Sequence, residues 1–251
     1  MTAHVPPVTV ADERSRMLPH PVRHDVPMPD LLDRPLYDVA QAARLLSVPP
    51  STIRWWLEGR APTYDPVLRE QPTGDGVMTW GEFVEARYVA AYRRRDVPLQ
   101  HIRRFIAHLR ETTGSQFPLA TRRPGVGSGK RLLLAASEDA ELEPELWPVY
   151  EPVSGQLLLT PPAQSFLDVV EFGNEDDSVV RLLHPRGRTS PVVIDPELRA
   201  GLSSVGGIST LVLKELVDAG DAVEAVAEDY GLDLDATIAA LEYERTLTLA
   251  A

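Results

Sequence analysis

Residues 36–56 read LYDVAQAARLLSVPPSTIRWW, and this stretch decides the fold of the N-terminal half. Apolar residues recur at helical spacing along its first part, which predicts a helix over residues 38–46 with Asp38 as the N-cap. A tight turn over residues 47–49 follows. Because proline is well tolerated in the first turn of a helix, a second helix is expected to begin near Pro50. Two short helices joined by a tight turn predict a helix-turn-helix.

The second helix presents two different faces. Ile53 and Trp56, three residues apart, are expected to point inward, whereas the outward positions carry hydroxyl, guanidinium and indole groups: Ser51, Thr52, Arg54 and Trp55. Hydroxyls near a helix N-terminus meet phosphates or base edges, and arginine reaches phosphate or guanine. An exposed tryptophan in basic surroundings favours DNA contact. The alternative is a helical hairpin whose outer face is simply solvated.

The motifs around this stretch resemble the MerR-type winged helix-turn-helix. The resemblance rests on residues 36–56, on MTWGEF at 78–83 and on VPLQHIRR at 97–104. It implies a wing over residues 63–78, two closing helices, a homodimer on operator DNA, and a set of DNA contacts: Thr52, Arg54, Trp55, Arg60 and, in the wing, Arg69. MerR-type regulators usually continue into a long dimerisation helix. This chain instead enters a region rich in proline and glycine, and it has no cysteine, so metal or thiol sensing is not expected.

Charge is divided unevenly along the chain. Residues 87–131 hold eleven basic and two acidic side chains, a local net of +9, whereas residues 132–251 hold six basic and twenty-three acidic ones, a net of −17. The formal total of −12 conceals this contrast. It favours two partners of opposite sign, a polyanion for the middle of the chain and a basic surface for its end. The alternative is two solvated surfaces that differ only in sign.

Helical periodicity returns over residues 208–247, and Gly220 and the turn at residues 230–232 divide it into three short helices. These helices predict a second unit that is similar to a helix-turn-helix. Its last helix carries acidic side chains: Asp235, Glu242 and Glu244. Because like charge repels phosphate, this unit is expected to bind protein rather than DNA.

The C-terminal unit resembles a widespread small domain, formerly of unknown function, that is found in antitoxins paired with PIN-like ribonucleases. The resemblance rests on VIDPEL at 193–198, GGIST at 206–210 and the region 226–243; residues 201–204 read GLSS where that family usually has a Gly-x-Pro hairpin. Together the two domains are similar to the VapB-type antitoxins of actinobacteria. The resemblance implies autorepression of an operon and neutralisation of a VapC-type toxin, a PIN-like ribonuclease. An arginine placed among the nuclease carboxylates would displace Mg²⁺, and the candidates are Arg186, Arg188 and Arg245.

We therefore expect an α+β fold, mostly α, in four segments. Residues 1–35 hold seven prolines and predict an extended arm. The other segments are the MerR-like winged helix-turn-helix at 36–115, a β-rich connecting region at 116–190 and the acidic helical antitoxin domain at 191–251. The strands expected around the connecting region cover residues 117–121, 131–135, 156–159, 179–183 and 192–194.

Several motifs that suggest other chemistry lack the residues it needs. GVGSGK at 125–130 is preceded by Pro124, where a Walker A loop needs glycine, and followed by Arg131, where it needs serine or threonine. His101 and His108 have no further ligand at a matching position. The acidic cluster at 138–145 lacks the spacing of a calcium loop. We expect no metal, no cofactor and no catalytic residues.

The chain has no apolar run near the roughly 20 residues needed to span a bilayer, and no hydrophobic signal core at its N-terminus. We expect a soluble cytoplasmic protein with no membrane partner. One alternative function stays open. The chain could be a MerR-like transcriptional regulator that responds to a small ligand bound in the strand region over residues 116–200, without a protein toxin as partner.

Overall fold

The computed structural model describes residues 31–60, 62–121, 166–173 and 179–250, with short stretches at 140, 149–150 and 158–159. The expected arm up to residue 30, the strand expected at 131–135 and most of the acidic cluster at 138–145 lie outside the described residues.

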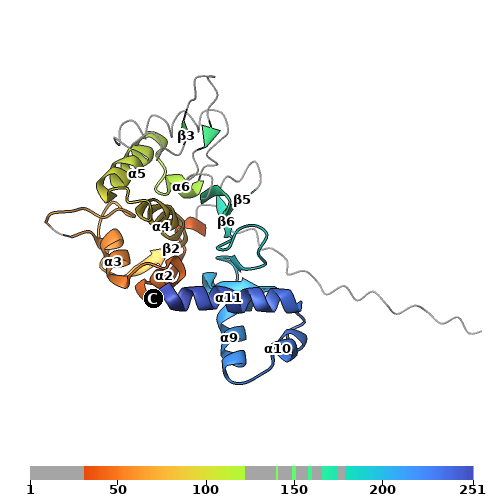
Figure 1. Cartoon of the computed structure of the whole chain (residues 1–251). Helices are drawn as coiled ribbons and strands as arrows, with labels where there is room; N and C mark the ends of the chain where they lie inside the picture. The colour runs from red at the N-terminus through yellow and green to blue at the C-terminus, as the bar shows by residue number, and fades with distance from the viewer. Residues whose placement is uncertain are drawn as a thin grey trace, which may run out of the picture.

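Helices make up most of the described N-terminal residues, 31–60 and 62–121 (Figure 1). α2 (Val39–Leu46) and α3 (Pro50–Glu58) form the helix-turn-helix, and α4 (Trp80–Arg93) and α5 (Leu99–Thr113) follow it. β1 (Pro35–Asp38) and β2 (Val77–Thr79) pair in an antiparallel sheet just before α2 and α4. One further helical turn, α6 (Pro118–Thr121), packs on α4 and α5.

Local sequence determines where α2 begins and ends and where α3 begins. Asp38 Oδ1 accepts a hydrogen bond from Gln41 N at 2.7 Å, and Gln41 Oε1 accepts one from Asp38 N at 3.2 Å, which completes a capping box. Ser47 ends α2 with φ at 54°, and Pro50 is the first residue of α3. The expected N-cap at Asp38 and the expected start at Pro50 are confirmed.

The strand expected at residues 117–121 is wrong, because this segment is the helical turn α6. A strand would alternate its side chains between two faces, whereas the helical turn buries Phe117, Leu119 and Ala120 together. Phe117 packs against Gly81 of α4 so closely that a Cβ on Gly81 would lie 2.5 Å from its ring. Leu119 N donates to the buried carboxylate of Glu85 at 3.2 Å.

The C-terminal half holds a five-stranded antiparallel sheet in which neighbouring strands follow one another along the chain. Its strands are β5 (Val170–Phe172), β6 (Val180–Leu183), β7 (Val193–Ile194), β8 (Ser203–Val205) and β9 (Ile208–Ser209). The strands expected at 179–183 and 192–194 are confirmed. In the strand expected at 156–159, β4 (Leu158–Leu159) pairs with β3 (Val149–Tyr150). Because the five-stranded sheet crosses residue 190, we describe its strands and the helices after them as one unit.

A two-residue turn, Gly206–Gly207, joins β8 and β9. Both glycines have positive φ, 57° and 81°, as a tight hairpin with glycine at both positions requires. The turn lets Ile208 pair with Val205 in the sheet. The expected helix over 208–219 is therefore wrong in its first two residues, which form β9.

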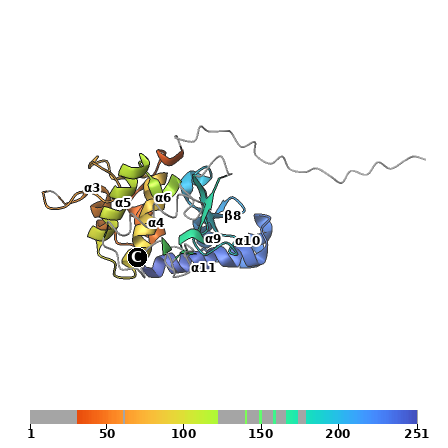
Figure 2. The ribbon, with the colours of Figure 1, turned by 90° about the horizontal axis from the view of Figure 1, so that it is seen from above.

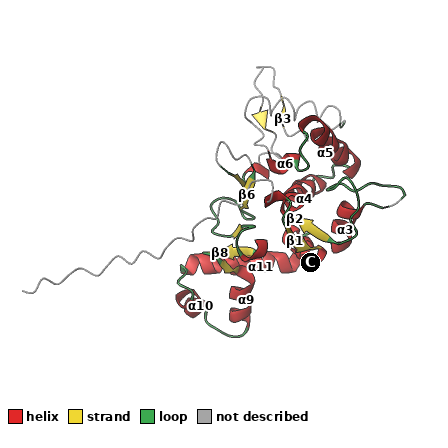
Figure 3. Ribbon diagram, turned by 180° about the vertical axis from the view of Figure 1, so that it is seen from behind, coloured by secondary structure: helices red, strands yellow, loops and turns green. Residues whose placement is uncertain are grey.

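Three helices complete the chain, as expected from the sequence. They are α9 (Thr210–Asp218), α10 (Val223–Asp229) and α11 (Leu234–Ala250), and a short 3₁₀ turn, η2 (Arg199–Gly201), precedes β8. α11 packs against α9 and α10 and extends back to α2 (Figure 1). Figures 1 to 3 agree that α3 and α10 lie at opposite ends of the part of the chain that the structure describes.

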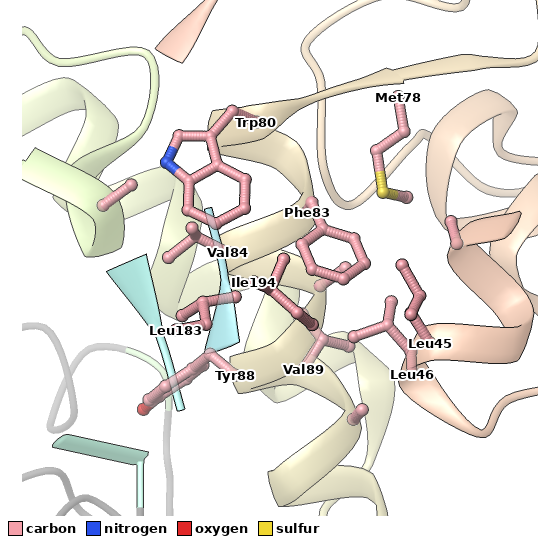
Figure 4. Close-up of a cluster of buried hydrophobic side chains, with 14 of the residues drawn as sticks. Leu45, Leu46, Met78, Trp80, Phe83, Val84, Tyr88, Val89, Leu183 and Ile194 are labelled. Carbon is pink, nitrogen blue, oxygen red and sulfur yellow. The ribbon is translucent and has the colours of Figure 1, made fainter. Parts of the chain in front are cut away.

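The two halves share one hydrophobic core. Trp80 and Phe83 of α4 belong to the same cluster of buried side chains as Leu183 and Ile194 of the C-terminal sheet (Figure 4). The indole Nε1 of Trp80 donates to the carbonyl oxygen of Val180 at 2.8 Å. α4, which follows the helix-turn-helix, is therefore packed directly on the C-terminal sheet.

Buried polar contacts also join the halves. Tyr37 Oη donates to the carbonyl oxygen of Gly201 at 2.8 Å. Arg44 of α2 forms an ion pair with Glu244 of α11, whose side chain is fully buried and also accepts a hydrogen bond from Thr210 Oγ1 at 2.5 Å. Glu244, which the sequence suggested as part of an acidic surface, is thus neutralised inside the protein and does not face solvent.

Candidate nucleic-acid interface

α3 is buried on one face and open on the other. Ile53 and Leu57 are fully buried and Trp56 is 2% exposed, so these side chains anchor the helix against the core. Arg54 is exposed, and Trp55 is 36% exposed although it is a large apolar side chain. The expected orientation of Ile53, Trp56 and Trp55 is confirmed. The open face is free to enter a DNA groove.

Five of the predicted DNA-contact residues lie around one shallow hollow of about 340 Å³ on this face, together with Gly59: Ser51, Thr52, Arg54, Trp55 and Arg60. Gly59 ends α3 with φ at 69°, and a Cβ there would lie 2.5 Å from the carbonyl oxygen of Tyr64. This tight turn lets Arg60 and Tyr64 exchange backbone hydrogen bonds of 2.7 and 3.0 Å. Glycine at residue 59 therefore places Arg60 beside the N-terminal half of α3.

Arg69, the sixth predicted contact, lies elsewhere. Its side chain is 7% exposed and makes two hydrogen bonds to the Glu82 carboxylate, from Nε at 2.8 Å and from Nη2 at 3.0 Å. Nη1 also donates to Glu58 at 3.1 Å and to Thr73 Oγ1, and Nη2 donates to the carbonyl oxygen of Val77 at 2.8 Å. A buried guanidinium with these partners has no donor left for phosphate, so the assignment of Arg69 to DNA binding is corrected to a structural role.

A second hollow, of about 350 Å³, lies between α3 and α5. Thr52 and Trp55 line both hollows, and the second adds side chains that the sequence analysis did not single out: Tyr64, Arg93, Gln100 and Arg103. The rings of Trp55 and Tyr64 meet edge to face with centroids 6.1 Å apart, and the Arg103 guanidinium lies 5.9 Å from the Tyr64 centroid. Arg93 and Arg103 fall in the basic segment 87–131, which is the signal by which they could have been found.

Other arginines of the basic segment are structural. Arg94 Nη2 donates to the carbonyl oxygen of Leu46 at 2.9 Å, and Arg110 Nη2 to Glu85 at 2.9 Å. Arg87 donates to Pro185, and burial lowers its pKa. The net charge of the segment therefore overstates the positive charge that the described surface offers to DNA.

Comparison with known proteins agrees with this arrangement. Residues 35–106 match the family described as "Putative DNA-binding HTH domain". Over 220 residues the chain is 30% identical to the Mycobacterium tuberculosis protein "Putative antitoxin VapB45", an alignment that covers 81% of this chain and 91% of that protein. This chain belongs to the VapB45 family.

Two other mycobacterial proteins support the same family. The uncharacterised protein Rv2308 of Mycobacterium tuberculosis is 31% identical over 237 residues, which cover 91% of this chain and 98% of that protein. The crystal structure of Rv2018 from the same organism superposes with a TM-score of 0.61 at 26% identity, over 84% of this chain and 99% of that chain. The similarity to these proteins thus extends well beyond the helix-turn-helix.

Of the arginines predicted to enter a toxin in this VapB45-family member, two share one exposed turn. Arg186 and Arg188 lie between β6 and β7, and Arg188 Nη2 donates to the carbonyl oxygen of Val170 at 2.7 Å. Arg245 is exposed on α11, a separate element. The geometry does not test a role of these arginines in toxin binding, so all three assignments stay predictions.

A third hollow, of about 690 Å³, lies beside β2 and α5. Its two arginines already have partners: Arg69 pairs with Glu82, and Arg110 donates to Glu85 and to the carbonyl oxygens of Leu68 and Gln116. These guanidinium groups are unavailable to an anionic ligand. The alternative function places a small ligand in the region 116–200, and most of residues 122–165 within it lie outside the described residues.

Within the part of the chain that the structure describes, no group of three or more histidine, aspartate or glutamate side chains could hold a metal ion. Over the same residues, no helix has both the length and the apolar composition that a membrane span needs.

Proposed function

We propose that this VapB45-family protein is a DNA-binding antitoxin that represses its own operon and neutralises a PIN-like, VapC-type ribonuclease. In this proposal it binds operator DNA as a homodimer through α3, and its acidic C-terminal half binds the toxin. It acts by binding and carries out no reaction of its own.

One observation supports the DNA-binding part most directly. Ser51, Arg54 and Trp55 are exposed on α3, and Arg60 lies beside them, while the opposite face of the helix is fully buried. An exposed tryptophan is unusual. Its position next to an exposed arginine on the second helix of a helix-turn-helix therefore favours a binding role for both side chains. Ser51 and Thr52 at the start of α3 and Arg54 one turn later suit contacts to phosphates and base edges.

The toxin-binding part rests on the family and on the exposed face of α11. Leu234 and Ile238 are 40% and 39% exposed, and Asp235 and Glu242 are exposed on the same helix. An apolar stripe with acidic neighbours complements a basic, partly apolar protein surface, such as the RNA-binding face of a nuclease. Because α10 and α3 lie at opposite ends, a toxin near the start of α11 and DNA at α3 would not collide.

The proposal expects a small nuclease gene beside this one, and the test is a reconstitution with its product. The purified neighbour should cleave RNA alone and lose that activity when this protein is added, and the pair should co-elute. The purified chain should also shift a duplex from its own promoter. Full ribonuclease activity in the co-eluting complex would refute neutralisation, and failure to shift the promoter at low salt would refute autorepression.

The arginine hypothesis has a separate test. Arg186→Ala, Arg188→Ala and Arg245→Ala are each compared for inhibition and for co-elution. Loss of inhibition with co-elution retained would support entry of that arginine into the carboxylate cluster of the nuclease. Inhibition that survives all three changes would refute only this detail, since the toxin could be covered by other residues.

A further inference from the structure

Arg103 of α5 differs from the other arginines around it. Its Nε and Nη2 atoms are buried and have no hydrogen-bond partner among the described residues. By contrast, Arg93 and Arg94 donate to backbone carbonyls, and Arg69 and Arg110 donate to carboxylates. Buried donors are nearly always paired in folded proteins, so an unpaired guanidinium edge calls for an acceptor from outside.

The surroundings of Arg103 supply a cation–π contact but no acceptor for its two buried nitrogens. The centroid of the Tyr64 ring lies 5.9 Å from the guanidinium carbon. Burial lowers the pKa of Arg103, whereas the nearby charge of Asp65 raises it. Asp65 is exposed and accepts no described hydrogen bond from either nitrogen. Arg103 is therefore a partly desolvated cation with two N–H groups that lack a described acceptor.

The position of this cation indicates what the acceptor is. Arg103 lines the hollow between α3 and α5, and that hollow shares Thr52 and Trp55 with the hollow on the exposed face of α3. When a recognition helix lies in the major groove, the elements beside it face the phosphates that flank the groove. A phosphate oxygen is a strong acceptor for two parallel guanidinium N–H groups.

We propose that the Arg103 side chain turns into the hollow beside α3 when DNA binds, and that its Nε and Nη2 then donate to one DNA backbone phosphate next to the bases contacted by α3. This inference rests on the proposed DNA binding and adds a second, sequence-independent anchor on a different helix. Thr52 lines both hollows, so its hydroxyl belongs to the same surface.

The experiment measures binding of the full chain to its own promoter duplex and to an unrelated duplex of equal length, over a series of salt concentrations. Arg103→Gln should weaken binding to both duplexes by a similar factor, about tenfold or more, because a charged hydrogen bond is lost. The slope of log affinity against log salt concentration should decrease in magnitude by about one, the change expected for the loss of one phosphate contact. Arg104→Gln, an exposed neighbour on α5, is the matched control and should change the affinity less than about twofold, as expected of exposed charges.

Three further variants protect the test against misfolding. Arg103→Lys keeps the charge but loses the two-pronged donor, so it should retain most of the salt slope while binding more weakly. Tyr64→Phe should bind like the wild type, and Tyr64→Ala should weaken binding to both duplexes. Thermal unfolding of each variant is measured alongside.

Three results would overturn the inference: an unchanged salt slope in Arg103→Gln, a loss confined to the promoter duplex, or an equal loss in Arg104→Gln. If the wild type binds neither duplex, the proposed function fails together with it. If the wild type binds and Arg103→Gln binds equally well, only the phosphate contact fails.

Discussion

The ion pair between Arg44 and Glu244 predicts an asymmetric effect of removing either partner. The Glu244 side chain is fully buried, whereas the Arg44 side chain is 32% exposed. Arg44→Met would leave a buried carboxylate with Thr210 as its described side-chain donor. Glu244→Gln would leave a cation that can turn toward water, and glutamine can still accept from Thr210.

The expected magnitudes follow from this difference in burial. Removing one partner of a fully buried pair costs about 3–5 kcal/mol, and partial exposure of Arg44 reduces this to about 2–3 kcal/mol for Arg44→Met. Glu244→Gln loses one charge-assisted hydrogen bond and should cost about 1 kcal/mol.

The assay is urea unfolding followed by circular dichroism and by the fluorescence of the tryptophans, among them Trp80 at the junction of the two halves. Lys214→Met is the matched control, since Lys214 forms an exposed i, i+4 pair with Asp218 on α9, and this change should cost less than about 0.5 kcal/mol. A cost for Arg44→Met no greater than that of Lys214→Met, or a larger cost for Glu244→Gln, would refute the reasoning.

Three further outcomes are expected. Burial raises the pKa of Glu85 to about 7, above its unfolded value of about 4.3, so folding stability should fall as pH rises between these two values. In urea titrations from pH 4 to 8, Glu85→Gln should flatten this dependence of stability on pH. An unchanged profile in the variant would contradict the prediction. Arg69→Ala should cost about 3–5 kcal/mol by stranding two carboxylates, and any folded fraction should bind DNA like the wild type. Arg54→Ala should leave unfolding unchanged and weaken promoter binding by about 1–3 kcal/mol in a titrated gel-shift assay, and an equal affinity would exclude a base contact.

Periodicity and capping were enough to predict the helix-turn-helix. Asp38, Pro50 and the inward pair Ile53 and Trp56 all follow from local rules, and the structure places them as expected. The strand predicted at 117–121 was wrong because the conformation of this segment depends on a tertiary contact with Gly81, which local sequence preference cannot show.

The candidate site could be predicted only where exposure follows from helical position. Ser51, Arg54 and Trp55 meet this condition, because the opposite face of one helix is apolar. Arg69 does not, since its carboxylate partner Glu82 lies thirteen residues away and only the fold brings the two together. Arg103 was missed for the same reason: its role depends on which of its donors lack a partner, and composition carries no such information.

α11 contacts α9 and α10 as well as α2 of the helix-turn-helix, and these shared contacts have a thermodynamic consequence. Glu244 holds α2 from the middle of a helix whose exposed face, at Leu234 and Ile238, is open to a protein partner. A ligand that stabilises α11 would therefore also stabilise α2, the helix against which α3 packs. Under the proposed function, reciprocity would then require operator DNA to strengthen toxin binding by the same factor by which the toxin strengthens operator binding.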